Sequence, residues 1–506
     1  MRIERTKNTL RNIVAGSVNR VINIILPFFT RTAILYIMGT KYLGLSSLFS
    51  SILSFLSLTE LGIGGAMVYS MYKPIAENDN ETICALLNLY KKLYRIIGAV
   101  VLTLGLAIMP FLDRLINDEV PAEINLQLLY FIYLLNSVLS YWLFAYKNAL
   151  LQAHQRNDVN SNIASVITPA SYVVMLGALF LTRNYYAYVI WLPVFTVITN
   201  IIRSRYVDRH YPELKPGGEV SQELKQSITK KVAALIGTKL NTVVLHAADN
   251  LVMSAFLGLT AIAIYGNYHY IMSAVMGFLG IIYSAMTAGL GNSIQTESVE
   301  KNYADFEKLS FMNAWITGWC TVCLVCLYQP FMRIWMGEER MFPFYVVLQF
   351  GLYFYVYQIR KIPVVYKDAA GIWWEDRFRP YVCMVVNVVF NIALVQVIGI
   401  SGIILSTVIS LLISIPWENY TIFKYVFHRG SGAYYGKLFW YAGSMILAAL
   451  PTFWLCSIPG DGIMSFLLRG VICVIVPNII FAGLNCKSKE FQNSVLFAKR
   501  ILKRQY

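Results

Sequence analysis

Long apolar segments recur along the whole chain and alternate with short polar stretches. Each is close to the ~20 residues that an α-helix needs to cross the hydrocarbon core of a bilayer. The pattern predicts an all-α, polytopic membrane protein. We expect about fourteen spans, near residues 12–38, 43–71, 93–112, 124–146, 160–182, 185–206, 231–257, 261–290, 308–330, 343–366, 380–398, 401–423, 438–457 and 462–484.

The composition agrees with this class and explains the charge. Charged residues make up 14% of the 506 positions, whereas soluble domains carry roughly 25%. With the N-terminus inside, roughly 33 of the 42 Lys and Arg residues fall on cytoplasmic segments, as the positive-inside rule requires. The membrane topology therefore explains the net charge of +15, and no nucleic-acid partner is expected. Both termini should be cytoplasmic, with no cleavable signal peptide.

An internal repeat organises the spans. YKNA at 146–149 returns as YKDA at 366–369, an offset of 220, and the spacing from Arg20 to Gly39 returns from Lys239 to Gly258, an offset of 219. Each copy lies at an equivalent place in a block of six spans, as in parallel-repeat transporters. The repeat predicts two pseudo-symmetric six-helix lobes, at 1–206 and 231–427. A cytoplasmic linker at 207–230 joins them, and 428–506 adds two spans and a basic cytoplasmic tail.

Polar side chains form a stripe on the first helix of each predicted lobe. Positions i, i+3, i+7 and i+11 share a helix face. On the first span they are Arg20, Asn23, Pro27 and Arg31, and on the seventh they are Lys239, Thr242, His246 and Asn250. Charge at bilayer depth is costly, so the stripes predict a cationic cavity between the lobes. Arg20 can also snorkel to the cytoplasmic surface, whereas Arg31, about 12 Å inside Gly39, is expected in the cavity.

Acidic residues and cysteines are the other candidates within the spans. Glu60 and Asp249 either pair with a buried cation or form a proton or sodium site, and no other cofactor is expected. Arg469 and His269 have no assigned role. Cys320, Cys323 and Cys326 lie in WITGWCTVCLVCLYQPF without a nearby histidine or carboxylate, so no metal site is predicted there.

Four stretches resemble the bacterial oligosaccharide flippases of the multidrug/oligosaccharidyl-lipid/polysaccharide (MOP) exporter superfamily. They are ILPFFTRTAILYIMGTKYLGLSSLFSSILSFLSLTELGI at 25–63, YKPIAENDNETI at 72–83, HAADNLVMSAFLGLTAIAIYGNY at 246–268 and KDAAGIWWEDRFRP at 367–380. The resemblance covers nearly the whole chain and includes twelve-plus-two spans. It implies a MATE-like fold, alternating access, and an undecaprenyl-diphosphate-linked oligosaccharide received on a cationic cavity in which first-span arginines, here Arg20 and Arg31, are prominent.

The predicted function is thus a flippase of the bacterial cytoplasmic membrane that serves cell-surface polysaccharide biosynthesis. It is not an enzyme, and polysaccharide polymerase and glycosyltransferase machinery are its expected partners. A multidrug cation antiporter of the same superfamily is one alternative, although it would require carboxylates where the stripes are cationic. A membrane glycosyltransferase or polymerase is another, although the outside loops are all short, at roughly a dozen residues or fewer.

Overall fold

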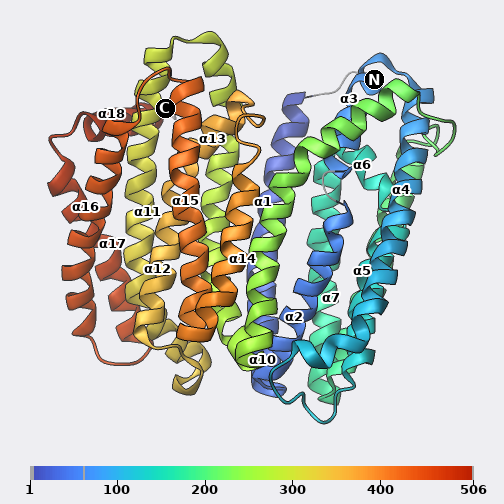
Figure 1. Cartoon of the computed structure of the whole chain (residues 1–506), viewed down its shortest axis with the longest axis horizontal. Helices are drawn as coiled ribbons and strands as arrows, with labels where there is room; N and C mark the ends of the chain where they lie inside the picture. The colour runs from blue at the N-terminus through green and yellow to red at the C-terminus, as the bar shows by residue number, and fades with distance from the viewer. Residues whose placement is uncertain (1–4, 61–62, 504–506) are drawn as a thin grey trace. The chain divides into compact units, whose positions relative to one another are not determined.

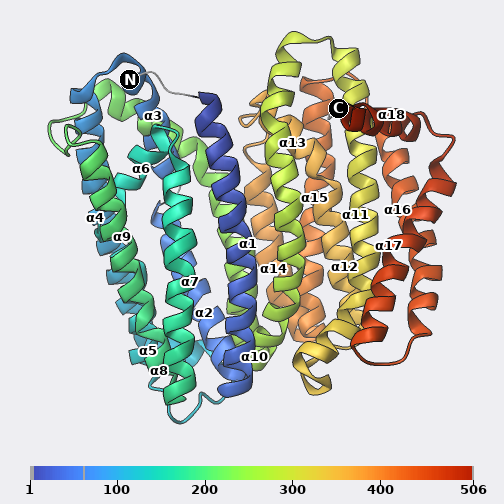
Figure 2. The same cartoon turned by 180° about the vertical axis from the view of Figure 1, so that it is seen from behind.

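The chain folds as two compact helical units, Met1–Ala263 and Ile264–Tyr506. The computed structural model describes residues 5–60 and 63–503 (Figure 1). Every regular element in these residues is a helix, and within each unit the long helices run side by side (Figure 2). The predicted all-α class is confirmed. The predicted lobe boundaries at 206 and 231 stay a prediction.

Helices of the first unit follow the order of the predicted spans, with short 3₁₀ segments between some of them. They are α1 (Arg5–Ile37), α2 (Thr40–Leu56), η1 (Ser57–Glu60), α3 (Ile63–Glu77), α4 (Asn80–Ile108), η2 (Met109–Leu115), α5 (Leu126–Trp142), α6 (Tyr146–Ala153), α7 (Asn157–Thr182), α8 (Tyr185–Val189), α9 (Trp191–His210) and the start of α10 (Gln222–Thr296).

The second unit contains the rest of α10 and the remaining helices. They are α11 (Val299–Met336), η3 (Glu338–Arg340), α12 (Phe344–Ile359), α13 (Lys361–Ala370), α14 (Arg379–Ile398), α15 (Ile400–Tyr425), α16 (Gly432–Ser457), α17 (Ile463–Asn485) and α18 (Lys489–Lys503). The hairpin of α16 and α17 packs against α11, and so does α18.

Ten helices in the described part of the chain are long and apolar enough to cross a membrane, or eleven if α5 and α6 count as one bent span. Helices α2 and α12 have only 17 and 16 residues. Helix α10 counts once although a non-helical residue interrupts it. The total of about fourteen therefore stays a prediction.

Two glycines aligned by the sequence repeat break helices in the same way. Gly39 separates α1 from α2 with φ 103° and ψ 176°, and Gly258 interrupts α10 with φ 84° and ψ 178°. Only glycine adopts such a conformation readily. The break at Gly258 falls between the predicted seventh and eighth spans.

Three predicted spans are interrupted. The span predicted at 43–71 is divided among α2, η1 and α3, and the glycines of SLTELGIGG are weak helix formers. The span predicted at 124–146 bends by 52° between α5 and α6, where Phe144 has φ 58°. The span predicted at 343–366 is divided at Arg360, between α12 and α13.

Candidate functional site

The first unit contains a polar cavity bordered by η1, α3, α4, α5, α6, α7 and α9. Its volume is about 600 Å³. A second cavity of about 450 Å³, which reaches α2, shares three of its lining residues. Such polarity among membrane-spanning helices marks a candidate functional site. The polar lining of the larger cavity comprises Glu60, Tyr90, Tyr94, Ser140, Tyr141, Asn148, Gln152, Thr168, Ser171, Thr196, Thr199, Asn200 and Arg203.

Glu60, predicted as an intramembrane acid, lies at this cavity and contacts tyrosine hydroxyls. The Tyr94 hydroxyl donates a hydrogen bond to Glu60 Oε1, and the Tyr90 hydroxyl donates to Tyr94 Oη at 2.7 Å. The ring of Tyr141 lies 5.7 Å from that of Tyr94. No lysine or arginine of the described residues forms an ion pair with Glu60. The hydroxyls therefore stabilise the carboxylate without neutralising its charge.

Arg203, near the end of α9, supplies a cationic group to the same cavity. Its Nε, Asn200 Nδ2 and Asn148 Oδ1 are buried and have no hydrogen-bond partner within residues 5–60 and 63–503. A buried polar atom without a partner costs about 1–3 kcal/mol. A ligand with both acceptors and donors would satisfy all three atoms, and the guanidinium fork suits phosphate or carboxylate oxygens.

The sequence contains a signal for the position of Arg203. Thr196, Thr199, Asn200 and Arg203 occupy positions i, i+3, i+4 and i+7 of α9, which form one helix face. Because Arg203 lies near the cytoplasmic end of the span predicted at 185–206, the positive-inside rule also explains its charge. The charge by itself therefore does not show that Arg203 belongs to a polar stripe.

The predicted stripe on α1 lies outside the linings of these two cavities. Arg20 and Asn23 are exposed in the first unit, and Arg31 is half-buried. Asn23 Nδ2 donates to Asn19 O at 2.8 Å and to Asn19 Oδ1 at 2.9 Å. Helix α1 packs mainly along α7. The cavity role of Arg20, Arg31 and Asn23 stays a prediction.

The stripe on α10 is described only in part. Asn250 is half-buried and donates from Nδ2 to Ser51 Oγ at 2.8 Å. Asp249 is buried. The side chains of Lys239 and His246 lie outside the described part of the structure. Their predicted contribution to a substrate site therefore remains a prediction.

In the second unit, the KDAAGIWWEDRFRP stretch forms a buried ion network. Asp376 accepts from Lys367 Nζ at 2.6 Å and from Arg379 Nη2 at 2.7 Å. Arg379 also lies 3.0 Å from Glu418 Oε1, which Arg360 Nη2 approaches at 2.8 Å. The network joins the turn after α13 to α15. Each charged group of the network thus has an oppositely charged partner within it.

A smaller network in the first unit contains the repeat partner of Lys367. Lys147 Nζ donates to Ser204 Oγ at 2.7 Å and to Asp208 Oδ1 at 2.6 Å. Both lysines are buried on short helices, α6 and α13, that follow a bent or divided span. Each lysine thus anchors its short helix through an ion pair, which is buried at Asp376 and exposed on the carboxylate side at Asp208.

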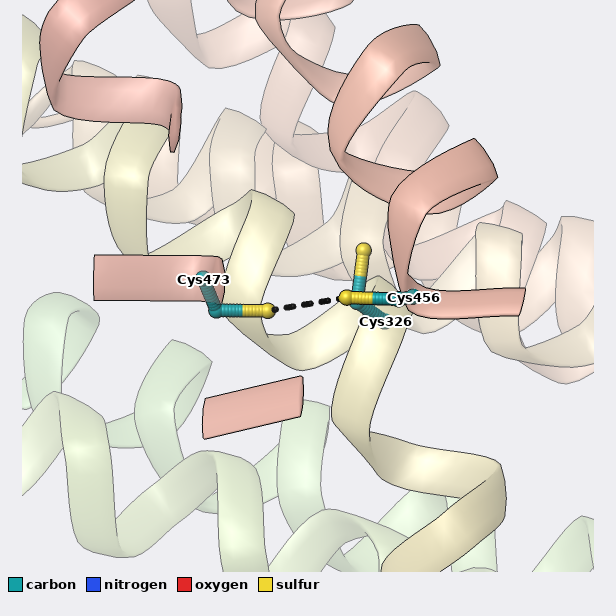
Figure 3. Close-up of side chains that lie close together, drawn as sticks. All are labelled: Cys326, Cys456 and Cys473. Carbon is teal, nitrogen blue, oxygen red and sulfur yellow. Dashed lines mark hydrogen bonds between the residues drawn. The ribbon is translucent and has the colours of Figure 1, made fainter. Parts of the chain in front are cut away.

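The cysteines that lie close together in space are not the three that lie close together in the sequence. Among the described residues, a close group of metal-ligating side chains is formed by Cys326, Cys456 and Cys473 of α11, α16 and α17 (Figure 3). Cys320 and Cys323 do not belong to it.

Comparison with known proteins identifies the fold. No protein-family model and no curated protein matches the chain. A solved structure of the lipid II flippase MurJ in an inward closed conformation is similar with TM-score 0.65 at 14% identity, over 94% of this chain and 98% of that one.

Transporters of a second kind share the architecture. An inward-facing multidrug resistance MATE family transporter of the MOP superfamily is similar with TM-score 0.60 at 14% identity, over 81% of this chain and 98% of that one. A MOP superfamily transporter from Pyrococcus furiosus has TM-score 0.56 at 12% identity, over 82% and 95%. The chain is a multi-helical membrane protein with the fold of the MOP superfamily transporters.

Proposed function

We propose that the protein is a flippase that moves an undecaprenyl-diphosphate-linked oligosaccharide across the bacterial cytoplasmic membrane. The product would serve cell-surface polysaccharide biosynthesis, with polymerase and glycosyltransferase machinery as partners. Alternating access of a MOP-type fold carries the head group, and no covalent bond is made or broken. The observation that carries the proposal is the Arg203 region of a large polar cavity on a flippase-like fold.

The share of this chain that matches the flippase structure favours a lipid-linked substrate over drug cations. The chain matches the MurJ structure over 94% of its own length, but the multidrug transporter over 81%. The flippase likeness thus extends over more of the chain. A lipid-linked substrate also explains why a transporter needs a roomy polar cavity: the head group enters it while the polyprenyl tail stays in lipid.

The chemistry of the cavity suits the head group. Arg203 can form two parallel hydrogen bonds with phosphate oxygens. Asn148, Asn200 and Gln152 offer amide donors and acceptors that match sugar hydroxyls. Arg20, Arg31, Lys239, Asn23, His246 and Asn250, which belong to the two predicted stripes and not to the described lining of this cavity, are proposed as further binding residues for the head group. An inside-negative potential helps an anion to leave by about 2.3 kcal/mol per charge per 100 mV.

A translocation assay in proteoliposomes tests the proposal. We expect Arg203→Ala to lower the rate of flipping of a lipid-linked oligosaccharide at least about tenfold, since a hydrogen bond to a charged group contributes roughly 1.5–3 kcal/mol. Arg203→Lys should recover part of the rate, because it keeps the charge but loses the fork. Arg205→Ala, an exposed arginine on the same helix, is the matched control. A wild-type rate for Arg203→Ala would refute this head-group site.

Arg31→Ala tests the predicted α1 stripe in cells. In a strain that lacks the chromosomal copy of the protein, this variant should fail to restore surface polysaccharide. Normal polysaccharide would exclude a head-group role for Arg31 while leaving the Arg203 site standing.

A multidrug cation antiporter is the second candidate, and Glu60 is the observation that favours it. A carboxylate at a cavity can attract a cation or carry a coupling proton, and Asp249 is the other candidate for coupling. Glu60→Gln separates the two functions. For a flippase we expect no efflux of lipophilic cations from wild-type cells. Efflux that Glu60→Gln abolishes, with no flipping by the wild type, would establish the antiporter instead.

A further inference from the structure

Three cysteine thiols from three helices of the second unit converge on one point. Cys326 lies on α11, Cys456 near the end of α16 and Cys473 on α17 (Figure 3). All three sulfur atoms lie within 4.8 Å of one another. The Sγ atoms of Cys456 and Cys473 are 3.7 Å apart. All three residues are free cysteines.

The sulfur atoms of Cys456 and Cys473 lie at the contact distance of thiols, which is nearer to the spacing in a metal–thiolate centre than to that in a disulfide. Two sulfurs bound at about 2.3 Å to one metal, with an S–metal–S angle of 110–120°, lie ~3.8–4.0 Å apart. A disulfide would bring them to about 2.05 Å. The observed 3.7 Å between Cys456 and Cys473 is close to the metal-bound spacing.

The thiols are buried, and the side chains of their cluster are apolar or contain sulfur. Cys326, Cys456 and Cys473 are 4%, 5% and 0% exposed. Their neighbours are the apolar or sulfur-containing side chains Val322, Cys323, Leu327, Met445, Ala449 and Ile472. Within the described residues the group contains no histidine or carboxylate. Three soft ligands without a fourth donor disfavour Zn²⁺, which takes four ligands, and favour Cu⁺.

Arg469 supplies the positive charge that such a centre needs. Its Nε donates to the Cys456 carbonyl at 2.8 Å, and its Nη2 donates to the Pro459 carbonyl at 2.6 Å. The guanidinium is therefore held beside Cys456. Two or three thiolates around one Cu⁺ carry a net negative charge, and burying that charge requires a nearby cation. This gives a role to an intramembrane arginine that the sequence leaves without one.

We propose that Cys326, Cys456 and Cys473 form a binding site for Cu⁺. On binding, each coordinating S–H group loses its proton to solvent and forms a Cu–S bond, and no electron is transferred. The bound ion would link the α16–α17 hairpin to α11. The site is independent of the transport cavity, which lies wholly in the first unit.

Copper titration of the full-length protein tests the proposal. The reduced protein in detergent micelles would be titrated anaerobically with Cu⁺ in competition with the chromophoric chelator bicinchoninate. We expect one tightly bound Cu⁺ per chain. Cys326→Ala, Cys456→Ala and Cys473→Ala should each lower the affinity for Cu⁺, and the variant that lacks all three thiols should lose the stoichiometric binding. Two controls should retain it, namely Cys320→Ala on the same helix as Cys326 and Cys383→Ala at a buried thiol of α14.

X-ray absorption on the wild type keeps the test valid if a variant does not fold. Sulfur scatterers at about 2.3 Å would support the site, whereas nitrogen or oxygen scatterers would overturn it. Wild-type affinity for Cu⁺ in all three cluster variants, or copper binding by the variant that lacks all three thiols, would also overturn it. So would a Cys456–Cys473 disulfide that re-forms after reduction, shown by non-reducing peptide mapping, because that bond consumes two of the ligands.

Discussion

Glu418→Gln is a substitution for which the structure predicts a large loss of stability. The Glu418 side chain is fully buried on α15. It accepts from Arg360 Nη2 at 2.8 Å and Nε at 3.1 Å, and from Ser414 Oγ at 2.9 Å, and Arg379 Nη1 lies 3.0 Å away. Removing one partner from a buried ion pair costs about 3–5 kcal/mol. We expect Glu418→Gln to lower the free energy of unfolding by that amount.

The pairing within the network sharpens the prediction. Three cations (Arg360, Lys367 and Arg379) face the buried anions Asp376 and Glu418, and the half-exposed Asp368 lies 3.9 Å from Lys367. After Glu418→Gln both Arg360 and Arg379 lose their ion pair with this carboxylate, whereas after Arg360→Met Glu418 keeps its ion pair with Arg379. Arg360→Met should therefore cost less than Glu418→Gln, and in the double variant the two changes should not be additive.

Equilibrium unfolding in mixed micelles, titrated with SDS, measures these free energies. Glu77→Gln is the control, since Glu77 pairs with Lys73 at 3.9 Å and both side chains are largely exposed, a pair worth under about 1 kcal/mol. The buried-network reasoning would be refuted if Glu418→Gln cost no more than Glu77→Gln. It would equally fail if Arg360→Met were the more damaging change.

Three further predictions concern close packing, acid stability and helix capping. Gly402→Ala should destabilise the protein by about 1–3 kcal/mol, because the added Cβ atom would lie 2.4 Å from a backbone carbonyl carbon of α14. Gly443→Ala is the control, since no atom lies within 4 Å of its added Cβ. Thermal unfolding in detergent measures the stability of both variants. Burial raises the pKa of Asp376, but Arg379 and Lys367 lower it further, and the net pKa lies below the usual 3.8. The contribution of the Asp376 carboxylate to folding stability is therefore present above about pH 4, and it is lost as the pH falls through the lowered pKa of the folded state. Thermal unfolding measured as a function of acid pH should show this loss in the wild type and not in Asp376→Asn. Asn125 caps α5 through its side-chain oxygen at 2.9 Å, so Asn125→Ala should cost about 1 kcal/mol and speed hydrogen exchange in the first turn of α5, and unchanged exchange would contradict the cap.

Membrane helices were largely predictable because their signal is local. A span must satisfy its own backbone hydrogen bonds in lipid, so a run of apolar residues by itself predicts a helix. Gly39 and Gly258 were recognisable as equivalent positions from the repeat alone. The interruptions after Leu56 and Trp142 are not predicted by hydropathy, because a broken helix has the same average hydropathy as a continuous one.

The candidate site was predictable only in part. Glu60 was identified because an acid inside a span is costly and therefore conspicuous. Arg203 was missed because a basic residue near the cytoplasmic end of a span has an ordinary explanation. Only the packing of α9 against α5 and α7 shows that its stripe borders a cavity.

The sequence by itself determined the all-helical membrane class, the positions of most spans and the presence of charge within them, since each follows from the local free energy of placing residues in lipid. The tertiary structure alone decided which distant side chains meet. Arg379 lies against Glu418, Tyr94 against Glu60, and Cys326 against two cysteines of the last two spans. Helices in lipid gain little hydrophobic energy from one partner over another, so polar contacts and close packing select the neighbours, and a linear pattern does not record them.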